Sequence, residues 1–251
     1  MKKGFAMILG IAILALILTG TGTADDPKEE QGILSYLEGS AQKSELNMEK
    51  WEFMKDQDPV KGGEKVKTLN ESRAELKLDI GKTIRMAPLT EVDILKLYKE
   101  VTEKGQVSDM KVRVSEGQIY SKIDALGEDE ELEIITPLAS ATIRGTVFQV
   151  TCDGEEKVEL DVIKGEVWVY SNNITDPRDY FKKNWGANKK PFVRINKPYH
   201  RVSKEKWMEV IKNMQRITIG KDGTTEISNL KESQLNKEWL DWNKKLDEGK
   251  Q

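Results

Sequence analysis

The residues that could do chemistry are few in this chain and far apart. One histidine, His200, and one cysteine, Cys152, occur among 251 residues. A catalytic nucleophile needs a base beside it, but His200 lies in NKPYHRV, where Pro198 and Tyr199 indicate a loop. One histidine and one cysteine also exclude a metal cage of the cysteine- and histidine-rich kind. We therefore expect no catalytic residue, no metal site and no cofactor, and hence a protein that is not an enzyme.

The densest carboxylates are EDEEL, residues 128–132. Paired carboxylates can hydrolyse glycosides, but like charges packed this closely resist folding into a pocket. The run also lacks the alternating spacing and the glycine of a calcium-binding loop. We expect it to form a solvated turn.

Two arginines stand in strand-like contexts, Arg85 in IRMAP and Arg144 in IRGT. An arginine among apolar strands needs a carboxylate partner, and its planar fork suits a bidentate one. Glu75 and Glu91 are the candidates. We expect buried ion pairs that fix strand register, so that Arg144→Ala should lower stability.

The charge balance and the N-terminus bear on location and partners. The 40 basic residues nearly balance the 43 acidic ones, so the chain lacks the net positive charge that attracts nucleic acid. Lys2 and Lys3 precede an apolar run at 5–19, and Gly22 and Ala24 stand at the −3 and −1 positions of a cleavage site. This is typical of a secretory signal peptide over residues 1–24; an uncleaved N-terminal anchor is the alternative. We expect a periplasmic or secreted protein that begins at Asp25.

Period-2 hydrophobicity predicts an all-β domain. In SRAELKLDI the apolar residues Ala74, Leu76, Leu78 and Ile80 alternate with charged ones, which places one row in a core and the other in water. Gly81 and Lys82 link this run to TIRMA as a hairpin. Further strands are expected at 33–37, 92–97, 112–114, 119–123, 132–135, 158–162 and 167–169. Such spacing indicates a sandwich, a barrel or a twisted stack of short strands over about 33–170.

The C-terminal third is predicted to be different. Residues 171–226 read as a loop-rich extension with short strands; 207–219 are open between helix and strand, and GKDG at 220–223 forms a turn. Residues 227–248 are expected to form an amphipathic helix, capped by Asn229 with Glu232 in a capping box. Its apolar stripe is Leu235, Trp239, Trp242 and Leu246, which we expect to dock on the β domain.

Aromatic side chains gather in the loop-rich extension. They could form a recognition surface, since aromatic rings supply contact area at little entropic cost, or they could pack on the sheet. The two interpretations stand equal. The residues are Tyr180, Phe181, Trp185, Phe192 and Tyr199.

The stretch TPLASATIRGTVFQV, residues 136–150, is predicted to be the architectural centre. We expect Ile143, Phe148 and Val150 to fill the core, Gly145 to allow a bend, and Arg144 to hold register. Cys152 continues the alternation, which favours a buried thiol. The motif residues are Thr136, Pro137, Ala139, Ala141, Ile143, Arg144, Gly145, Thr146, Phe148 and Val150.

With YLEGSAQ (36–42), SRAELKL with IRMAPLTEV (72–92) and VIKGEVWVY (162–170), this stretch resembles the FecR domain family of extracytoplasmic bacterial proteins. The resemblance implies an all-β periplasmic module at 32–170, after a linker at 25–31, with a role in signalling or assembly and no known catalytic residues. The founding members carry a cytoplasmic sigma-factor-binding domain before a membrane helix. Here only residues 1–4 precede the apolar run, so we expect no contact with a sigma factor. The expected function is non-enzymatic binding of an envelope or extracellular protein in signalling or assembly; the alternative is binding of cell-wall or surface polysaccharide.

Overall fold

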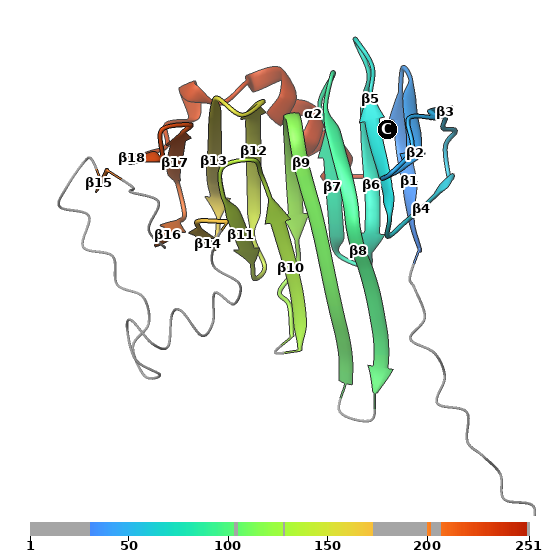
Figure 1. Cartoon of the computed structure of the whole chain (residues 1–251), viewed down its shortest axis with the longest axis horizontal. Helices are drawn as coiled ribbons and strands as arrows, with labels where there is room; N and C mark the ends of the chain where they lie inside the picture. Colours follow the sequence, from blue (N-terminus) through green and yellow to red (C-terminus); the bar gives the residue numbers. More distant parts are fainter. Residues whose placement is uncertain (1–30, 103–104, 128, 173–199, 202–206, 250–251) are drawn as a thin grey trace, which may run out of the picture.

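The computed structural model describes residues 31–102, 105–127, 129–172, 200–201 and 207–249. Along these residues one β-strand follows another, and an α-helix comes after the last strand (Figure 1). The predicted signal peptide and the five aromatic residues of the loop-rich extension lie outside the described residues. None of the described helices has the length and apolar character that a bilayer crossing requires.

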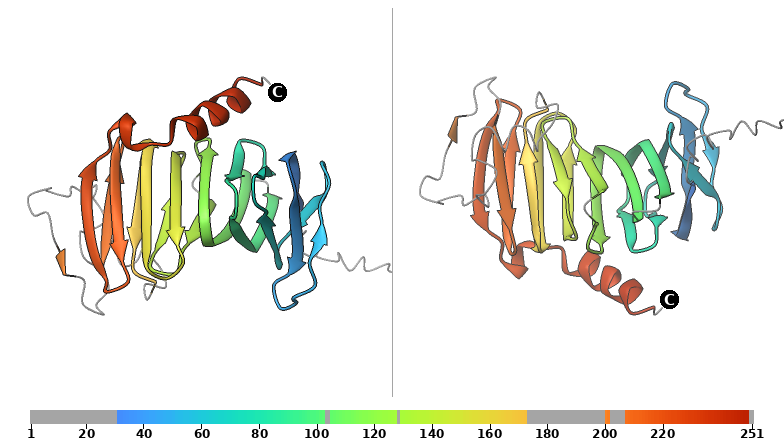
Figure 2. Two further views of the ribbon diagram at one scale, coloured as in Figure 1. Left: turned by 90° about the horizontal axis from the view of Figure 1, so that it is seen from above. Right: turned by 90° about the horizontal axis from the view of Figure 1, so that it is seen from below.

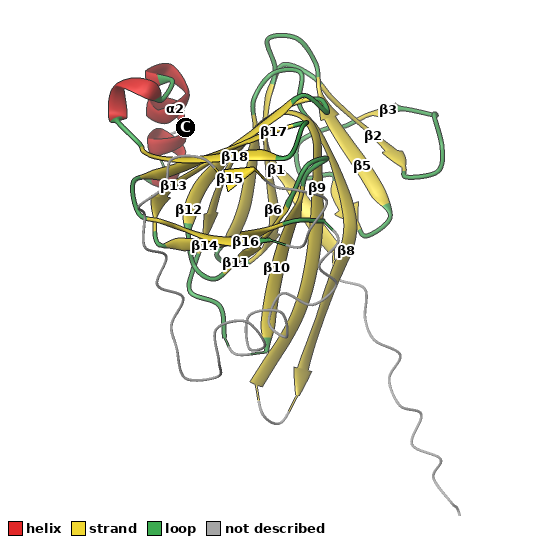
Figure 3. Cartoon of the chain, turned by 60° about the vertical axis from the view of Figure 1, so that its left-hand side comes forward, coloured by secondary structure: helices red, strands yellow, loops and turns green. Residues whose placement is uncertain are grey.

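The strands build two facing layers, sheets A and B, which share one long strand (Figure 3). Sheet A contains, in pairing order, β3 (Glu52–Phe53), β2 (Ala41–Glu45), β5 (Glu64–Thr68), β8 (Glu91–Thr102), β9 (Gly105–Ile123), β10 (Glu130–Ile135), β11 (Ser140–Ile143), β14 (Glu166–Tyr170) and β16 (Met208–Lys212). Sheet B contains β4 (Pro59–Lys61), β1 (Gln31–Glu38), β6 (Arg73–Asp79), β7 (Lys82–Met86), β9 again, β12 (Val147–Asp153), β13 (Lys157–Lys164), β17 (Gln215–Gly220), β18 (Thr224–Asn229) and β15 (His200–Arg201). Among the described strands every pairing is antiparallel except β9 with β10. The predicted fold class, mostly β with a C-terminal helix, is confirmed.

Strand β9 joins the two layers. Its residues up to Glu116 pair with β8 in sheet A, and those from Gly117 pair with β12 in sheet B. Gly117 has φ +90°, and a Cβ there would lie 2.5 Å from the Thr90 hydroxyl oxygen. A side chain would therefore clash where the strand passes between the sheets. The sequence predicted two separate strands, 112–114 and 119–123; they belong to one strand, and Gly117 marks its crossing between the sheets.

The core lies between the sheets and is built by alternation. Ala74, Leu76 and Leu78 of β6 are buried, as predicted. Ile80 is not: the prediction was wrong, and its side chain is 83% exposed. Strand β6 ends at Asp79, so Ile80 belongs to the turn into β7 and no longer follows the period of the strand.

The 136–150 motif contributes as expected to this core. Ile143, Phe148 and Val150 are fully buried. Gly145 has φ +84°, and a Cβ there would lie 2.8 Å from the Cα of Ala125, so the turn between β11 and β12 requires glycine. Cys152 is a buried free thiol, and burial raises its pKa to about 12.

The C-terminal region adds strands to both sheets before the helix. Residues 208–220 form β16 and β17, and the GKDG turn leads into β18. The helix α2 (Lys237–Asp247) begins later than predicted, after the short 3₁₀ turn η1 (Glu232–Gln234). Asn229 does not cap it, because this residue pairs with Gln215 in sheet B; Asn236 is the N-cap. Figure 2 shows α2 lying on the outside of the strands.

An ion cluster closes one end of the core. The ammonium group of Lys82 forms ion pairs with the carboxylates of Asp79, at 3.0 Å, and Glu130, at 2.7 Å. The ammonium group of Lys99 forms a third ion pair with Asp79, at 2.9 Å. Gln106 donates to both carboxylates. The expected solvated turn at 128–132 is wrong for Glu130, since its carboxylate is partly buried and cationic and polar side chains from other strands neutralise it.

We expect acid to weaken the fold through this cluster. Burial opposes ionisation of Asp79, but hydrogen bonds from Lys99, Lys82 and the backbone N–H of Ile80 outweigh it and lower its pKa from 3.8 to about 2. A carboxyl whose pKa is lower in the folded state stabilises the protein above the unfolded value, and this contribution is lost as pH falls from about 4 through about 2. Urea unfolding across this interval measures the loss. The free energy of unfolding of Asp79→Asn should decrease less over this interval than that of the wild type. Asp109 forms a more exposed pair with Lys96, so Asp109→Asn should behave like the wild type. Equal decreases for the wild type and Asp79→Asn would contradict the role given to Asp79.

Candidate interaction surface

Strand register places six residues side by side across the outer face of sheet B. Each faces away from the core because its strand neighbours point inward. Direct cross-strand partners are Glu75 and Arg85, Arg85 and Tyr120, Tyr120 and Gln149, Gln149 and Asp161, and Asp161 and Arg216. These six residues form the polar row.

Arg85 dominates one half of the polar row. Only 4% of this residue is exposed. Its Nε donates to the Glu75 carboxylate at 2.6 Å, and the Ser35 hydroxyl donates to the same carboxylate at 2.8 Å. The guanidinium carbon lies 5.7 Å from the centroid of the Tyr120 ring. The predicted buried ion pair between Arg85 and Glu75 is confirmed.

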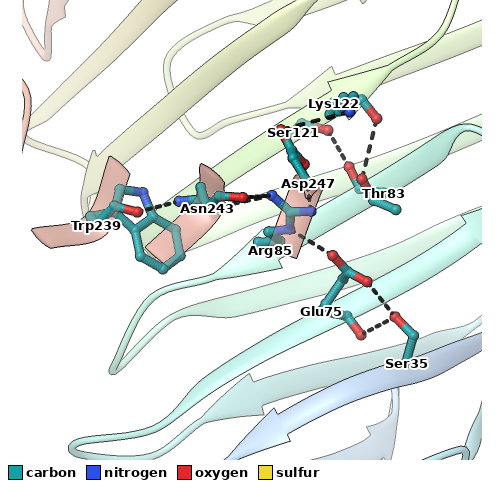
Figure 4. Close-up of polar contacts among 9 residues, drawn as sticks. All are labelled: Ser35, Glu75, Thr83, Arg85, Ser121, Lys122, Trp239, Asn243 and Asp247. Atoms are coloured by element: carbon teal, nitrogen blue, oxygen red, sulfur yellow. Dashed lines mark hydrogen bonds and ion pairs between the residues drawn. The ribbon is translucent and has the colours of Figure 1, made fainter. Parts of the chain in front are cut away.

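The helix α2 supplies the remaining partners of Arg85 (Figure 4). One terminal nitrogen donates to the backbone carbonyl of Asn243 at 2.8 Å, and the other donates to the Asp247 carboxylate at 2.7 Å. Trp239, Asn243 and Asp247 are spaced four residues apart and so share one stripe of the helix. The cation thus lies at the C-terminal end of α2, where the helix dipole favours positive charge.

Aromatic packing completes the contact between helix and sheet. Trp239 is buried with Ala87 and Tyr120. Its ring stacks on Trp242 at 5.0 Å, and Trp242 meets Tyr36 of β1 edge-on at 5.7 Å. This packing confirms that the helix docks on the β domain. Burial, with the nearby Asp247 carboxylate, raises the pKa of Tyr120 to about 12.

The other half of the polar row is a second buried charge pair. Two nitrogens of Arg216 donate to the Asp161 carboxylate at 2.5 and 2.7 Å, and the Gln149 amide donates to it at 2.7 Å. Asp161 is 1% exposed. Hydrogen bonding to Asp161 raises the pKa of the Arg216 guanidinium. This group links β12, β13 and β17.

Arg144 does not behave as predicted. It is exposed, and its guanidinium carbon lies 5.8 Å from the Trp168 ring centroid. The expected buried ion pair with Glu75 or Glu91 is wrong, because β11 ends at Ile143 and Arg144 falls in the turn that Gly145 makes.

Arg144 instead borders a pocket of about 240 Å³ at one end of β9, β10 and β11 in sheet A. Carboxylates outnumber this one cation in its lining, which consists of residues 107–109 and 129–131 with Thr142 and Arg144. Within the described residues no three His, Cys, Asp or Glu side chains are grouped to hold a metal ion.

Sequence reasoning missed most of the polar row and its helix partners. A usable signal existed for some of them: Gln149 stands between Phe148 and Val150, and Asp161 between Leu160 and Val162, so each is a polar residue on the outer face of a strand. No local signal shows that these outward side chains are buried. That property comes from register and from the helix.

Comparison with known proteins gave the following. No curated protein matches the sequence. Two crystal structures described as "a putative anti-sigma factor from Parabacteroides distasonis ATCC 8503" are similar at 13% and 12% identity, with TM-scores of 0.44 and 0.43, over 66% of this chain. The match spans 59% of the length of those proteins. Residues 64–168, from β5 into β14, match the family model described as FecR protein, and this chain therefore carries a FecR domain.

Proposed function

We propose that this chain is an exported, non-enzymatic protein-binding module of an envelope signalling or assembly system. The observation that carries the proposal is the FecR domain at residues 64–168. The matched residues form the middle strands of both sheets, in which charged side chains are paired across strands.

The chemistry of the reactive side chains supports a binding role. The Cys152 thiol is buried and its pKa is raised to about 12, so it is not a thiolate at neutral pH. Arg85 and Asp161 are each engaged by several partners. Such groups hold shape and position rather than move protons.

Cross-linking in intact cells tests the proposed function. A tagged full-length chain is cross-linked, its adducts are identified by mass spectrometry, and the identified protein is then titrated in purified form against the chain. We expect a saturable complex with an envelope protein. Retention on purified peptidoglycan or surface polysaccharide, without any protein adduct, would favour the polysaccharide alternative and overturn the proposal.

The location is tested separately by N-terminal sequencing of the exported protein. We expect the mature chain to begin at Asp25, because Gly22 and Ala24 provide the small residues that signal peptidase requires. A chain that retains Met1 in the membrane fraction would contradict this and indicate an anchor.

A further inference from the structure

The part of sheet B beneath α2 is positively charged where the two meet. Arg73 pairs with Glu238 near the start of the helix, and Arg85 and Lys122 pair with Asp247 at its end. On the sheet side, Glu75 pairs with Arg85, and Glu38 is the cross-strand neighbour of Arg73. Asp247 continues the sheet-facing stripe of Trp239 and Asn243, whereas the Glu238 side chain is 77% exposed. This face therefore complements a helix that presents a carboxylate at the C-terminal end of that stripe.

The helix contributes the matching pattern on that stripe. Trp239 supplies an apolar anchor, Asn243 is fully buried four residues later, and Asp247 follows at the next turn. Lys237, Lys244 and Lys245 are exposed. The contact is thus amphipathic, with Trp239 buried in one cluster with Tyr120 and charge-assisted hydrogen bonds around Arg85.

Several features make this helix a replaceable occupant. It has 11 residues, and an isolated helix of that length is marginal in water, so it gains its order from docking. The indole N–H of Trp239 is buried without a hydrogen-bond partner among the described residues, which makes the fit imperfect. The helix also lies after the matched FecR residues, whereas Arg73, Arg85 and Lys122 lie within them.

We propose that the cationic face of sheet B around Arg73, Arg85 and Lys122 is a docking surface for an amphipathic helix of a protein partner, and that α2 occupies it until such a helix displaces it. This proposal rests on the proposed function, because it names the surface through which a protein partner binds. The partner helix carries a large aromatic residue with a carboxylate two helical turns later. Displacement exposes Arg85 to water and to the incoming carboxylate, so the cation is not left buried and unpaired.

A peptide of residues 230–249, with a fluorescent label, probes the surface in the full-length protein. In the wild type α2 competes at high effective concentration, so we expect weak binding. The double variant Trp239→Ala with Asp247→Ala weakens the docking of α2 and so opens the surface; the affinity for the peptide should then increase by about tenfold or more.

Adding Arg85→Gln to this opened variant should weaken peptide binding by about thirtyfold. Adding Arg144→Gln instead, at an exposed arginine near sheet A, should not change it. Equal affinity of the wild type and the opened variant, or indifference to Arg85→Gln, would overturn the proposal.

Hydrogen exchange of the wild-type chain provides a measurement that needs no variant. Backbone amides of α2 should exchange through local opening, before those of β12. Helix amides that exchange only together with β12 would show that the helix is not displaceable.

The two proposals fail in different ways. If a cross-linked envelope protein binds Arg85→Gln as tightly as the wild type, the partner exists but docks elsewhere, and the inference is overturned while the proposed function stands. If the chain is retained on polysaccharide without any protein adduct, the proposed function is overturned and the inference with it, and binding of the peptide through Arg85 then shows only that α2 can be displaced from sheet B.

Discussion

Phe148→Ala is expected to lower the free energy of unfolding by about 3–5 kcal/mol. Phe148 is fully buried and is one of the largest side chains in the core. It lies on β12 between Ser121 of β9 and Val162 of β13, so the truncation leaves a cavity where three strands of sheet B meet. The surrounding strands are held by their ladders and cannot collapse into the space. Urea unfolding monitored by tryptophan fluorescence measures the change.

Arg144→Ala is the matched control, since it lies four residues earlier in the same motif but is exposed. We expect a change within about 0.5 kcal/mol. This reverses the expectation drawn from the sequence. A loss for Arg144→Ala as large as that for Phe148→Ala would show that the motif acts through Arg144 and would contradict the structure.

The strands of this fold could be predicted because alternation is a local property. In SRAELKLDI the sequence alone places Ala74, Leu76 and Leu78 in the core. The same pattern fails at Ile80, where a single residue beyond the end of β6 leaves the period of the strand. The ends of elements depend on turn geometry, which the hydrophobic pattern does not encode.

The two arginines show why the candidate surface could not be predicted in full. Arg85 and Arg144 both follow an isoleucine, and the sequence gives them the same environment. Arg85 is buried because Asn243 and Asp247 reach it from 158 and 162 positions along the chain. Arg144 lies one residue past the end of β11, where it is exposed and its guanidinium lies over the ring of Trp168. Long-range docking and strand ends decide the outcome, and neither has a local signature.

The acidic run is a further example in which non-local contacts override composition. Four carboxylates in a row indicate exposure to solvent, yet Glu130 is partly buried and has Lys82, Gln106 and Ser108 as partners. Those partners come from β7 and β9. Only the assembled sheets show that the charge of Glu130 is neutralised there.

Asp161→Ala is expected to lower the free energy of unfolding by about 3–5 kcal/mol. Asp161 is 1% exposed, and its removal leaves the Arg216 guanidinium and the buried Gln149 amide without their shared acceptor.

Glu159→Ala is the matched control. Glu159 lies two residues earlier on the same face of β13 and also pairs with Arg216, at 3.3 Å, but its side chain is 23% exposed. Water can replace Glu159, so we expect a loss of about 1 kcal/mol or less for this variant. Combining Asp161→Ala with Arg216→Ala should cost less than the sum of the single changes, because the uncompensated cation is then removed too. If Asp161→Ala were no more destabilising than Glu159→Ala in urea unfolding, the cross-strand pair would be a surface feature, and the outer face of sheet B would owe its rigidity to the hydrophobic core alone.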